Sequence, residues 1–303
     1  MSGCQNAHTQ VLTSCKDRFA FASTLAIYVY DLKTFQLQKL LNGTTSNILA
    51  IVWEPTNRKF LAQATYDRKV TIWDVEAEEV KFEVLLTHQV VHMEWNKANQ
   101  NELWVIEASG DIKCINLASK LVEQISIAVA GVPLICRQSY KNPEILAFGL
   151  DNGFICFFNL KSKETYLCDA CNSAERISEK QRRYVDQMSI FLTAQNKESA
   201  FPAELSPSEV KIVEVQWDPF ESNILVSFVD GSISLISYQG FCDKTVISQE
   251  FEPQSHSIRC MVWSQDRSGN FYTSSEKIGL LQSWNVASKE PKQSFKVGSS
   301  GVH

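Results

Sequence analysis

One pattern recurs along the chain and constrains its fold more than any other feature. Six segments share a tight polar turn, an alternating run of apolar and polar residues, and an aromatic or aliphatic anchor followed by a polar residue. Successive anchors are 43, 42, 43, 78 and 48 residues apart. A period of about 40 to 45 residues made of short strands is typical of propeller blades, so the pattern predicts small stacked sheets. The anchors are Tyr30, Trp73, Ile115, Phe158, Ile236 and Trp284.

A second anchor has the same register. In four units a tryptophan ends an apolar run about 20 residues before the first anchor, and Gln138 replaces it in the fourth unit, which we expect to diverge. A glycine recurs in the third tight turn, where it supplies the positive φ that a short hairpin needs. Each unit therefore predicts four short strands. The tryptophans are Trp53, Trp95, Trp217 and Trp263, and the glycines are Gly110, Gly153, Gly231 and Gly279.

These units predict an all-β propeller of about six blades in a single domain over residues 1–303. A four-stranded sheet cannot bury both of its faces alone, so such units pack radially on one another. Near the chain end, Gly301-Val302 resembles the Gly131-Val132 that opens the fourth blade. We therefore expect a piece of a longer chain whose ring has seven blades. Two alternatives remain: a ring of six blades can also close, and a ring that stays open would expose two sheet edges. The predicted blades are about 9–41, 46–86, 88–127, 131–167, 210–250 and 255–296.

The long fourth interval contains an insertion over residues 168–209. Ile177, Tyr184 and Phe191 fall on one face of a helix, and the segment after them is rich in turn residues. The sequence predicts a mostly helical or disordered insertion. Two interpretations remain: a helix packed on the rim of the ring, or an element that binds a partner.

Charge and composition exclude several classes of function. The net charge is −5 and the acidic and basic residues are spread along the chain, so no footprint for nucleic acid is visible. The longest apolar tract, Phe19 to Tyr30, is shorter than the roughly 18 residues of a membrane-spanning helix. The first fifteen residues lack the apolar segment of a secretory signal. We expect a cytoplasmic protein with reduced thiols and no membrane insertion.

The pair Cys168 and Cys171, in the sequence CDAC, is the first candidate for chemistry. A zinc site would need two more ligands, and neither a second CxxC nor an HxxxH follows. A thioredoxin-like pair would begin a helix beside a βαβ unit, which the all-β pattern excludes. We therefore predict no metal and no cofactor, and keep a metal- or thiol-dependent enzyme as the less favoured alternative.

Histidines are the second candidates. His88 and His256 each lie seven residues before a tryptophan. Because a catalytic base is needed once and a scaffold contact in every blade, this repetition indicates a structural role. No Ser/His/Asp set or carboxylate pair can be assembled from positions that the repeat brings together. We predict that the protein is not an enzyme.

The phrase TYDRKVTIWDV, residues 65–75, resembles the signature of WD repeats. In that family the Trp closes the third strand of a blade and is hydrogen-bonded through a Thr or Ser to a His, which the turn Asp holds. The resemblance implies these roles for Thr65, Asp67 and Trp73, and His88 and His256 match the His of the family's Gly-His dipeptide. The chain departs from the family pattern because no Gly precedes either His and most anchors are not Trp. With the other anchors, the residues predicted to be structural are Thr65, Asp67, Trp73, His88, Trp95, His256, Trp263 and Trp284.

Three further stretches carry a closer resemblance. Asp17 to Leu32, Val215 to Pro219 and Leu280 to Pro291 are similar to the N-terminal part of the WD repeat-containing protein 17 family. That family consists of longer chains with further WD repeats and a helical tail. The resemblance implies architecture and adds little about function.

Together these features predict a non-enzymatic protein–protein interaction scaffold. Its partners would be other proteins, which bind loops on one face or the rim. The alternative is the propeller part of a coat or ciliary transport subunit. Arg58, Arg137 and Tyr140 are ordinary candidates for contact, but the pattern assigns none of them to a site.

Overall fold

The computed structural model describes residues 10–127, 129–171, 210–241, 245–254, 256–275 and 279–296. The predicted insertion helix and the chain end fall outside these residues. Within them every regular element is a β-strand, as the all-β prediction required.

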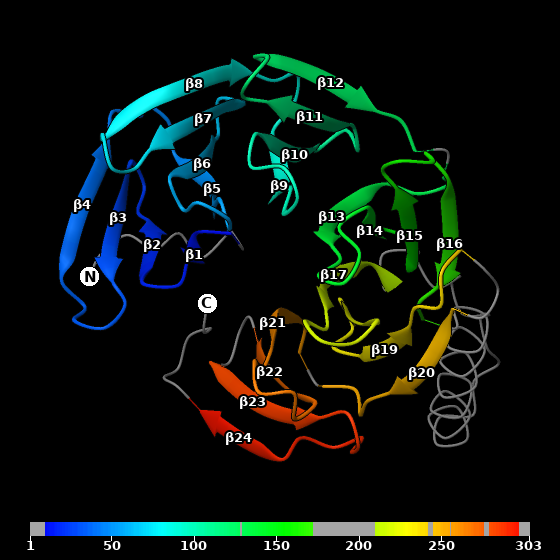
Figure 1. The fold of residues 1–303 in the computed structure, drawn as a ribbon. Coiled ribbons are helices and arrows are strands. Elements are labelled where there is room, and N and C mark those ends of the chain that lie inside the picture. The colour runs from blue at the N-terminus through cyan, green and yellow to red at the C-terminus, as the bar shows by residue number, and fades with distance from the viewer. Residues whose placement is uncertain are drawn as a thin grey trace, which may run out of the picture.

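Six four-stranded antiparallel sheets are arranged as the blades of a propeller (Figure 1). In each sheet the strands pair in chain order from the centre of the ring outward. Blade 1 contains β1 (Leu12–Ser14), β2 (Arg18–Ala22), β3 (Ala26–Asp31) and β4 (Leu37–Asn42); blade 2 contains β5 (Ile48–Trp53), β6 (Phe60–Thr65), β7 (Lys69–Asp74) and β8 (Glu79–Leu85); blade 3 contains β9 (Val90–Trp95), β10 (Glu102–Glu107), β11 (Ile112–Asn116) and β12 (Leu121–Ile125).

The second half of the chain repeats this arrangement. Blade 4 contains β13 (Pro133–Gln138), β14 (Ile145–Leu150), β15 (Phe154–Asn159) and β16 (Thr165–Asp169); blade 5 contains β17 (Ile212–Trp217), β18 (Asn223–Phe228), β19 (Ile233–Ser237) and β20 (Val246–Glu250); blade 6 contains β21 (Ile258–Trp263), β22 (Asn270–Ser275), β23 (Leu280–Asn285) and β24 (Gln293–Lys296).

The polar residue after each anchor ends the third strand of its blade. The Asp74 carboxylate accepts the Ala77 N–H at 3.2 Å, which closes the turn between β7 and β8. The Asn116 and Asn159 side chains likewise accept the N–H three residues on, and the Asn285 side chain accepts the N–H two residues on. Short side chains of this kind stabilise turns by bonding nearby backbone. The Trp-Asp pair in blade 2 is therefore placed at a turn.

Three of the four tryptophans at the end of the innermost strands join neighbouring blades, whereas the Trp53 indole donates to the Arg58 carbonyl of its own blade. The indole N–H of Trp95 donates to the Val52 carbonyl of blade 2 at 3.0 Å, and those of Trp217 and Trp263 bond the preceding blade in the same way. In the divergent fourth blade the Gln138 amide donates to Asn96 of blade 3 at 3.0 Å. The substitution thus keeps a bond between blades.

Buried apolar clusters fill the spaces between consecutive blades. There is one between each pair from blades 1 and 2 to blades 5 and 6. No such cluster joins blade 6 to blade 1 among the described residues. The innermost strands β1 and β5, and each later consecutive pair up to β17 and β21, are close neighbours, but β21 and β1 are not. The ring is interrupted there (Figure 1), and we call this gap the open side.

Candidate functional site

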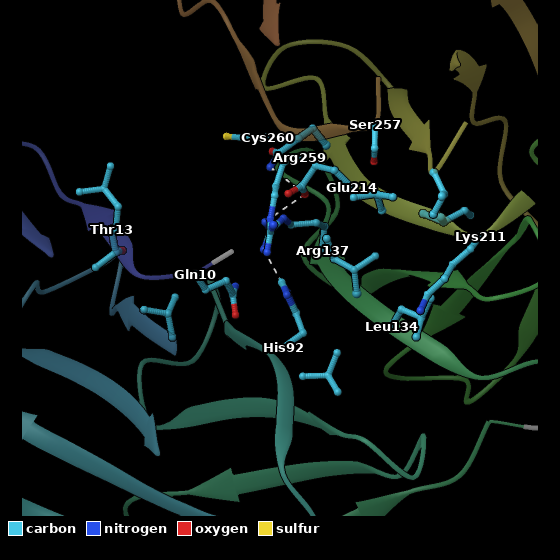
Figure 2. A pocket seen from close by; sticks show the side chains of 18 of the residues that line it. Gln10, Thr13, His92, Leu134, Arg137, Lys211, Glu214, Ser257, Arg259 and Cys260 are labelled. Atoms are coloured by element: carbon cyan, nitrogen blue, oxygen red, sulfur yellow. Dashed lines mark hydrogen bonds and ion pairs between the residues drawn. The ribbon is translucent and has the colours of Figure 1, made fainter. Parts of the chain in front are cut away.

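Arg137 occupies the centre of the ring, which is lined by the innermost strands. It comes from β13, and its guanidinium donates to Glu94 of β9 and to Glu214 of β17, each at 3.1 Å (Figure 2 shows its bond to Glu214). The same guanidinium lies 3.0 Å from the His92 imidazole. Burial opposes the charged form, but Glu214 and Glu94 more than offset it and raise the pKa of Arg137. One cation therefore links blades 3, 4 and 5.

His92 sits beside this cation as a neutral base. Burial, reinforced by the Arg137 charge, holds the pKa of His92 well below its ordinary value. Its Nε2 lies 2.8 Å from the Cys136 carbonyl oxygen and 3.0 Å from Arg137. One ring nitrogen cannot donate to the carbonyl and accept from the guanidinium in the same tautomer, so His92 makes one bond or the other.

Two cavities open from this cluster. One, of about 740 Å³, lies beside the first residues of the innermost strands and is lined by Lys211, Glu214 and Arg259 (Figure 2). The other, of about 750 Å³, reaches the open side, where Phe19 and Phe35 of blade 1 and Val262 of blade 6 line it. Arg137 lines both, so its ion pairs stand between the two cavities.

Blade 1 turns an aromatic face toward the open side. Ala20, Ala22, Ile27 and Val29 point the other way and are buried against blade 2. The alternate residues are large rings that pair across β2 and β3: Phe19 stacks on Tyr30 and Phe21 on Tyr28, with centroids 5.3 and 5.0 Å apart. A solvent-facing sheet normally carries polar residues at such positions. We call this surface, made of Leu12, Phe19, Phe21, Tyr28, Tyr30, Phe35, Leu37 and Leu40, the aromatic face.

Blade 6 turns a second apolar surface toward the same gap. Val262 and Tyr272 are paired across β21 and β22 and are 51% and 39% exposed. Leu281 and Phe295 are paired across β23 and β24, and the Phe295 ring is exposed. The opposite face of this blade, with Trp263 and Trp284, is buried against blade 5. The same rows also contain Ser274, Ser283 and Gln293, so this side of blade 6 mixes apolar and polar side chains.

The anchor tryptophan of blade 2 has a different hydrogen-bond partner from the one that the resemblance implied. The Trp73 indole donates to the Gln63 side chain at 3.0 Å, whereas Thr65 donates to Asp67 at 2.5 Å. Trp73 is paired with Leu61 across β6 and β7, so Gln63, two residues further along β6, is its diagonal neighbour on the same face. Thr65 lies another two residues along the strand, which is too far for the Trp73 indole to reach. Trp284 follows the same rule and donates to Thr273 at 3.0 Å. The bond to Thr65 that the resemblance implied is not formed.

The two repeated histidines have different surroundings. The His88 imidazole is exposed, and its backbone N–H donates to the buried Glu107 carboxylate at 2.9 Å. Among the described residues, His88, Glu107 and Asp111 are the one group whose ligand atoms lie close enough to hold a metal ion. Lys113 lies 3.9 Å from Glu107 and balances its charge. His256 instead lines the cavity of Figure 2.

The CDAC pair is part of the propeller core. Cys168 belongs to β16, and both Cys168 and Cys171 are buried in the cluster between blades 4 and 5. Burial raises the pKa of the Cys168 thiol to about 11. Neither cysteine belongs to a three-ligand group in the described part of the chain. The blade therefore extends past Leu167, where the sequence placed the start of the insertion.

Sequence reasoning did not assign the central cluster. Arg137, Glu94 and Glu214 come from different blades, and the repeat does not show which polar residues meet at the centre. The available signal was a charged residue inside the apolar run LICRQ of an innermost strand, where a charge needs a partner.

No family model matches the chain. Among solved structures, it is similar to the β-propeller domain of Cps50 (Swd1) from Myceliophteria thermophila, with a TM-score of 0.73 and 12% sequence identity. The match covers 99% of this chain and 90% of that one. The fold is a six-bladed β-propeller. In the described part of this propeller, no helix is long and apolar enough to cross a membrane.

Proposed function

We propose that the protein is a non-enzymatic interaction scaffold that binds another protein through the open side of its propeller. The aromatic face is the observation that carries this proposal. Folded monomers rarely expose contiguous apolar patches above a few hundred Å², and each buried aromatic ring removes about 150–250 Å² from water. On this face Leu12, Phe35, Leu37 and Leu40 are exposed, and the four rings of β2 and β3 are half-buried. A protein surface of similar polarity would remove the apolar area that remains from water, which is favourable.

The polar residues support a scaffold over an enzyme. Glu94 and Glu214 both accept bonds from Arg137, so neither carboxylate is free to act as a general acid or base. Burial raises the pKa of the Cys156 and Cys168 thiols to about 12 and about 11, which leaves very little reactive thiolate. These side chains stabilise the ring.

Narrower assignments remain predictions. The resemblance to the WD repeat-containing protein 17 family and the assignment to a coat or ciliary transport subunit both agree with a propeller that binds proteins. A cytoplasmic location and the absence of nucleic-acid binding also remain predictions from charge and composition.

Affinity capture with the full chain tests the function. We compare the wild type with Phe21→Ser/Tyr28→Ser, which makes the centre of the aromatic face polar, and with Tyr66→Ser, which changes an exposed ring on a loop. Circular dichroism melts establish that all three are folded. We expect the same proteins with the wild type and Tyr66→Ser, and their loss with the double variant. Equal recovery with the double variant would contradict the proposal.

A further inference from the structure

The innermost strands share a local irregularity that shapes the cavity of Figure 2. In β5, β9, β13, β17 and β21 the pairing with the next strand shifts by one residue, so each strand carries one extra, unpaired residue. Bulges of this kind re-aim side chains and are frequent next to functional sites. In the last four strands the extra residue lines the cavity; these residues are Val91, Leu134, Val213 and Arg259.

One of these four positions differs in chemistry from the others. Blades 3, 4 and 5 place an aliphatic side chain there, and that of Val91 is 41% exposed. Blade 6 places the Arg259 side chain at the same position (Figure 2). An apolar wall and a guanidinium therefore border the same space.

The cavity carries more positive than negative charge, although the whole chain has a net charge of −5. Arg137, Lys211 and Arg259 line it, and Glu214 is the one carboxylate among the described residues that do so. The charge of Arg137 is compensated, because it is bound to Glu94 and Glu214. The positive charge that a ligand meets therefore comes from Arg259 and from the exposed Lys211. A cleft with low-dielectric walls concentrates such a field.

The size and the lining of the cavity favour a small molecule with one anionic group. Its volume of about 740 Å³ lies in the range of about 300–1,000 Å³ that is typical of ligand pockets, which combine apolar walls with a few polar groups. A carboxylate or phosphate can accept hydrogen bonds from the Arg259 guanidinium, which has five donors. A ligand with many negative charges would be repelled by Glu214.

We propose that this cavity binds a small organic anion, whose carboxylate or phosphate lies against Arg259 and Lys211 and whose apolar body packs on Val91, Leu134 and Val213. None of these five residues belongs to the aromatic face. The inference therefore goes beyond the proposed function and does not depend on it.

Titrations of the full chain, followed by saturation-transfer NMR, test the inference. The probes are hexanoate and hexyl phosphate; hexanol lacks the charge, and acetate and inorganic phosphate lack the apolar body. All are measured at one ionic strength. We expect saturable binding of at least one six-carbon anion, at least about tenfold tighter than that of its three comparison compounds. The stronger of the two anions shows whether the site prefers a carboxylate or a phosphate.

Variants locate the site. Arg259→Gln/Lys211→Gln should weaken binding of the anion by about tenfold or more. Lys33→Gln/Lys161→Gln removes two exposed lysines outside the cavity and should leave the affinity unchanged. Ser257→Glu keeps both cations and adds a negative charge to the cavity lining, so it should also weaken binding and serves if the first variant does not fold. Circular dichroism melts establish which variants are folded.

Three results would overturn the inference: no saturable binding of either anion, an affinity for hexanol equal to theirs, or full affinity in the folded variants with altered charge. Phe21→Ser/Tyr28→Ser, which alters the aromatic face, should bind the anions as the wild type does. Loss of anion binding in that variant would place the site elsewhere and would also contradict the inference. Loss of partner capture is thereby distinguished from loss of anion binding.

Discussion

Arg137 shows how one buried side chain determines the centre of the ring. Removing two carboxylates and a guanidinium from water is costly, and their mutual attraction offsets that cost only when the geometry is good. Here the guanidinium faces Glu94 and Glu214 at 3.1 Å each. The three blades are thereby held in one relative arrangement, because a shift of any of the three strands would leave a buried charge without its counter-ion.

His92 makes the stability of the fold depend on pH. Folding lowers its pKa well below 6.5, so its contribution is complete above pH 6.5 and is lost as the pH falls toward the folded pKa. Between pH 7.5 and 5.5 we expect the wild type to lose about 1.4 kcal/mol more than His92→Gln, which stays neutral. Urea unfolding at the two pH values measures this difference. Equal losses in both proteins would mean that His92 is not buried as a neutral base.

Trp73 tests the packing between blades 1 and 2. Its ring lies in their shared cluster, so Trp73→Ala should lower the free energy of unfolding by about 3–5 kcal/mol. Gln63→Ala removes the indole's acceptor and should cost less, about 1–2 kcal/mol. Chemical denaturation monitored by circular dichroism measures both, with Tyr66→Ala as the exposed control. An unchanged transition in Trp73→Ala would show that this placement is wrong.

At the scale of the strand and the turn, much was predictable from the sequence. Alternation and turn residues act within one blade. The anchors Trp73 and Trp284, and the repeated glycines, which lie between the second and third strands of their blades, therefore correctly indicated small antiparallel sheets. The bond of Trp73 to Gln63 was missed, because the choice between two polar residues on one strand depends on the pairing register. The Arg137 cluster was missed because its members lie on separate blades.

Gly231 lies in a turn where both conformation and space require glycine. Its φ is +85°, and an added Cβ would overlap the carbonyl oxygens of Gln254 and His256. Gly240 has a similar φ of +91° but open space around it. We expect Gly240→Ala to cost about 1 kcal/mol from conformation alone, and Gly231→Ala clearly more. Thermal melts of the two variants compare them, and equal costs would contradict the close approach of the backbone at Gly231.

Residues 172–209 can be removed without cutting the described propeller. Cys171 and Val210 both lie against Gly153, so a short Gly-Ser linker can join them. The Cys168 and Cys171 side chains stay in the core, which a deletion starting at residue 168 would damage. We expect the shortened protein to keep its melting transition within a few degrees. Loss of soluble protein would show that the segment belongs to the core.

For the whole molecule, the decisive feature is that six blades form five packed interfaces. The sequence predicted about six blades and left closure open, because whether the last blade reaches the first depends on the accumulated rotation of all six sheets. An open ring was expected to expose sheet edges; the structure instead exposes sheet faces, with Leu37 and Leu40 on one and Val262 and Tyr272 on the other. The apolar character of those faces links the architecture to the binding of another protein.

Hydroxyl-radical footprinting of the purified chain tests this claim most directly. Oxidation rates of the half-buried rings of Phe21 and Tyr28 and of the exposed ring of Tyr272 are compared with those of Phe157 and Phe158, which are buried between blades. The account predicts faster oxidation of the first three rings than of the last two. Protection of Phe21, Tyr28 and Tyr272 to the level of Phe157 would mean that the ring is closed by the chain itself, and would contradict the open side.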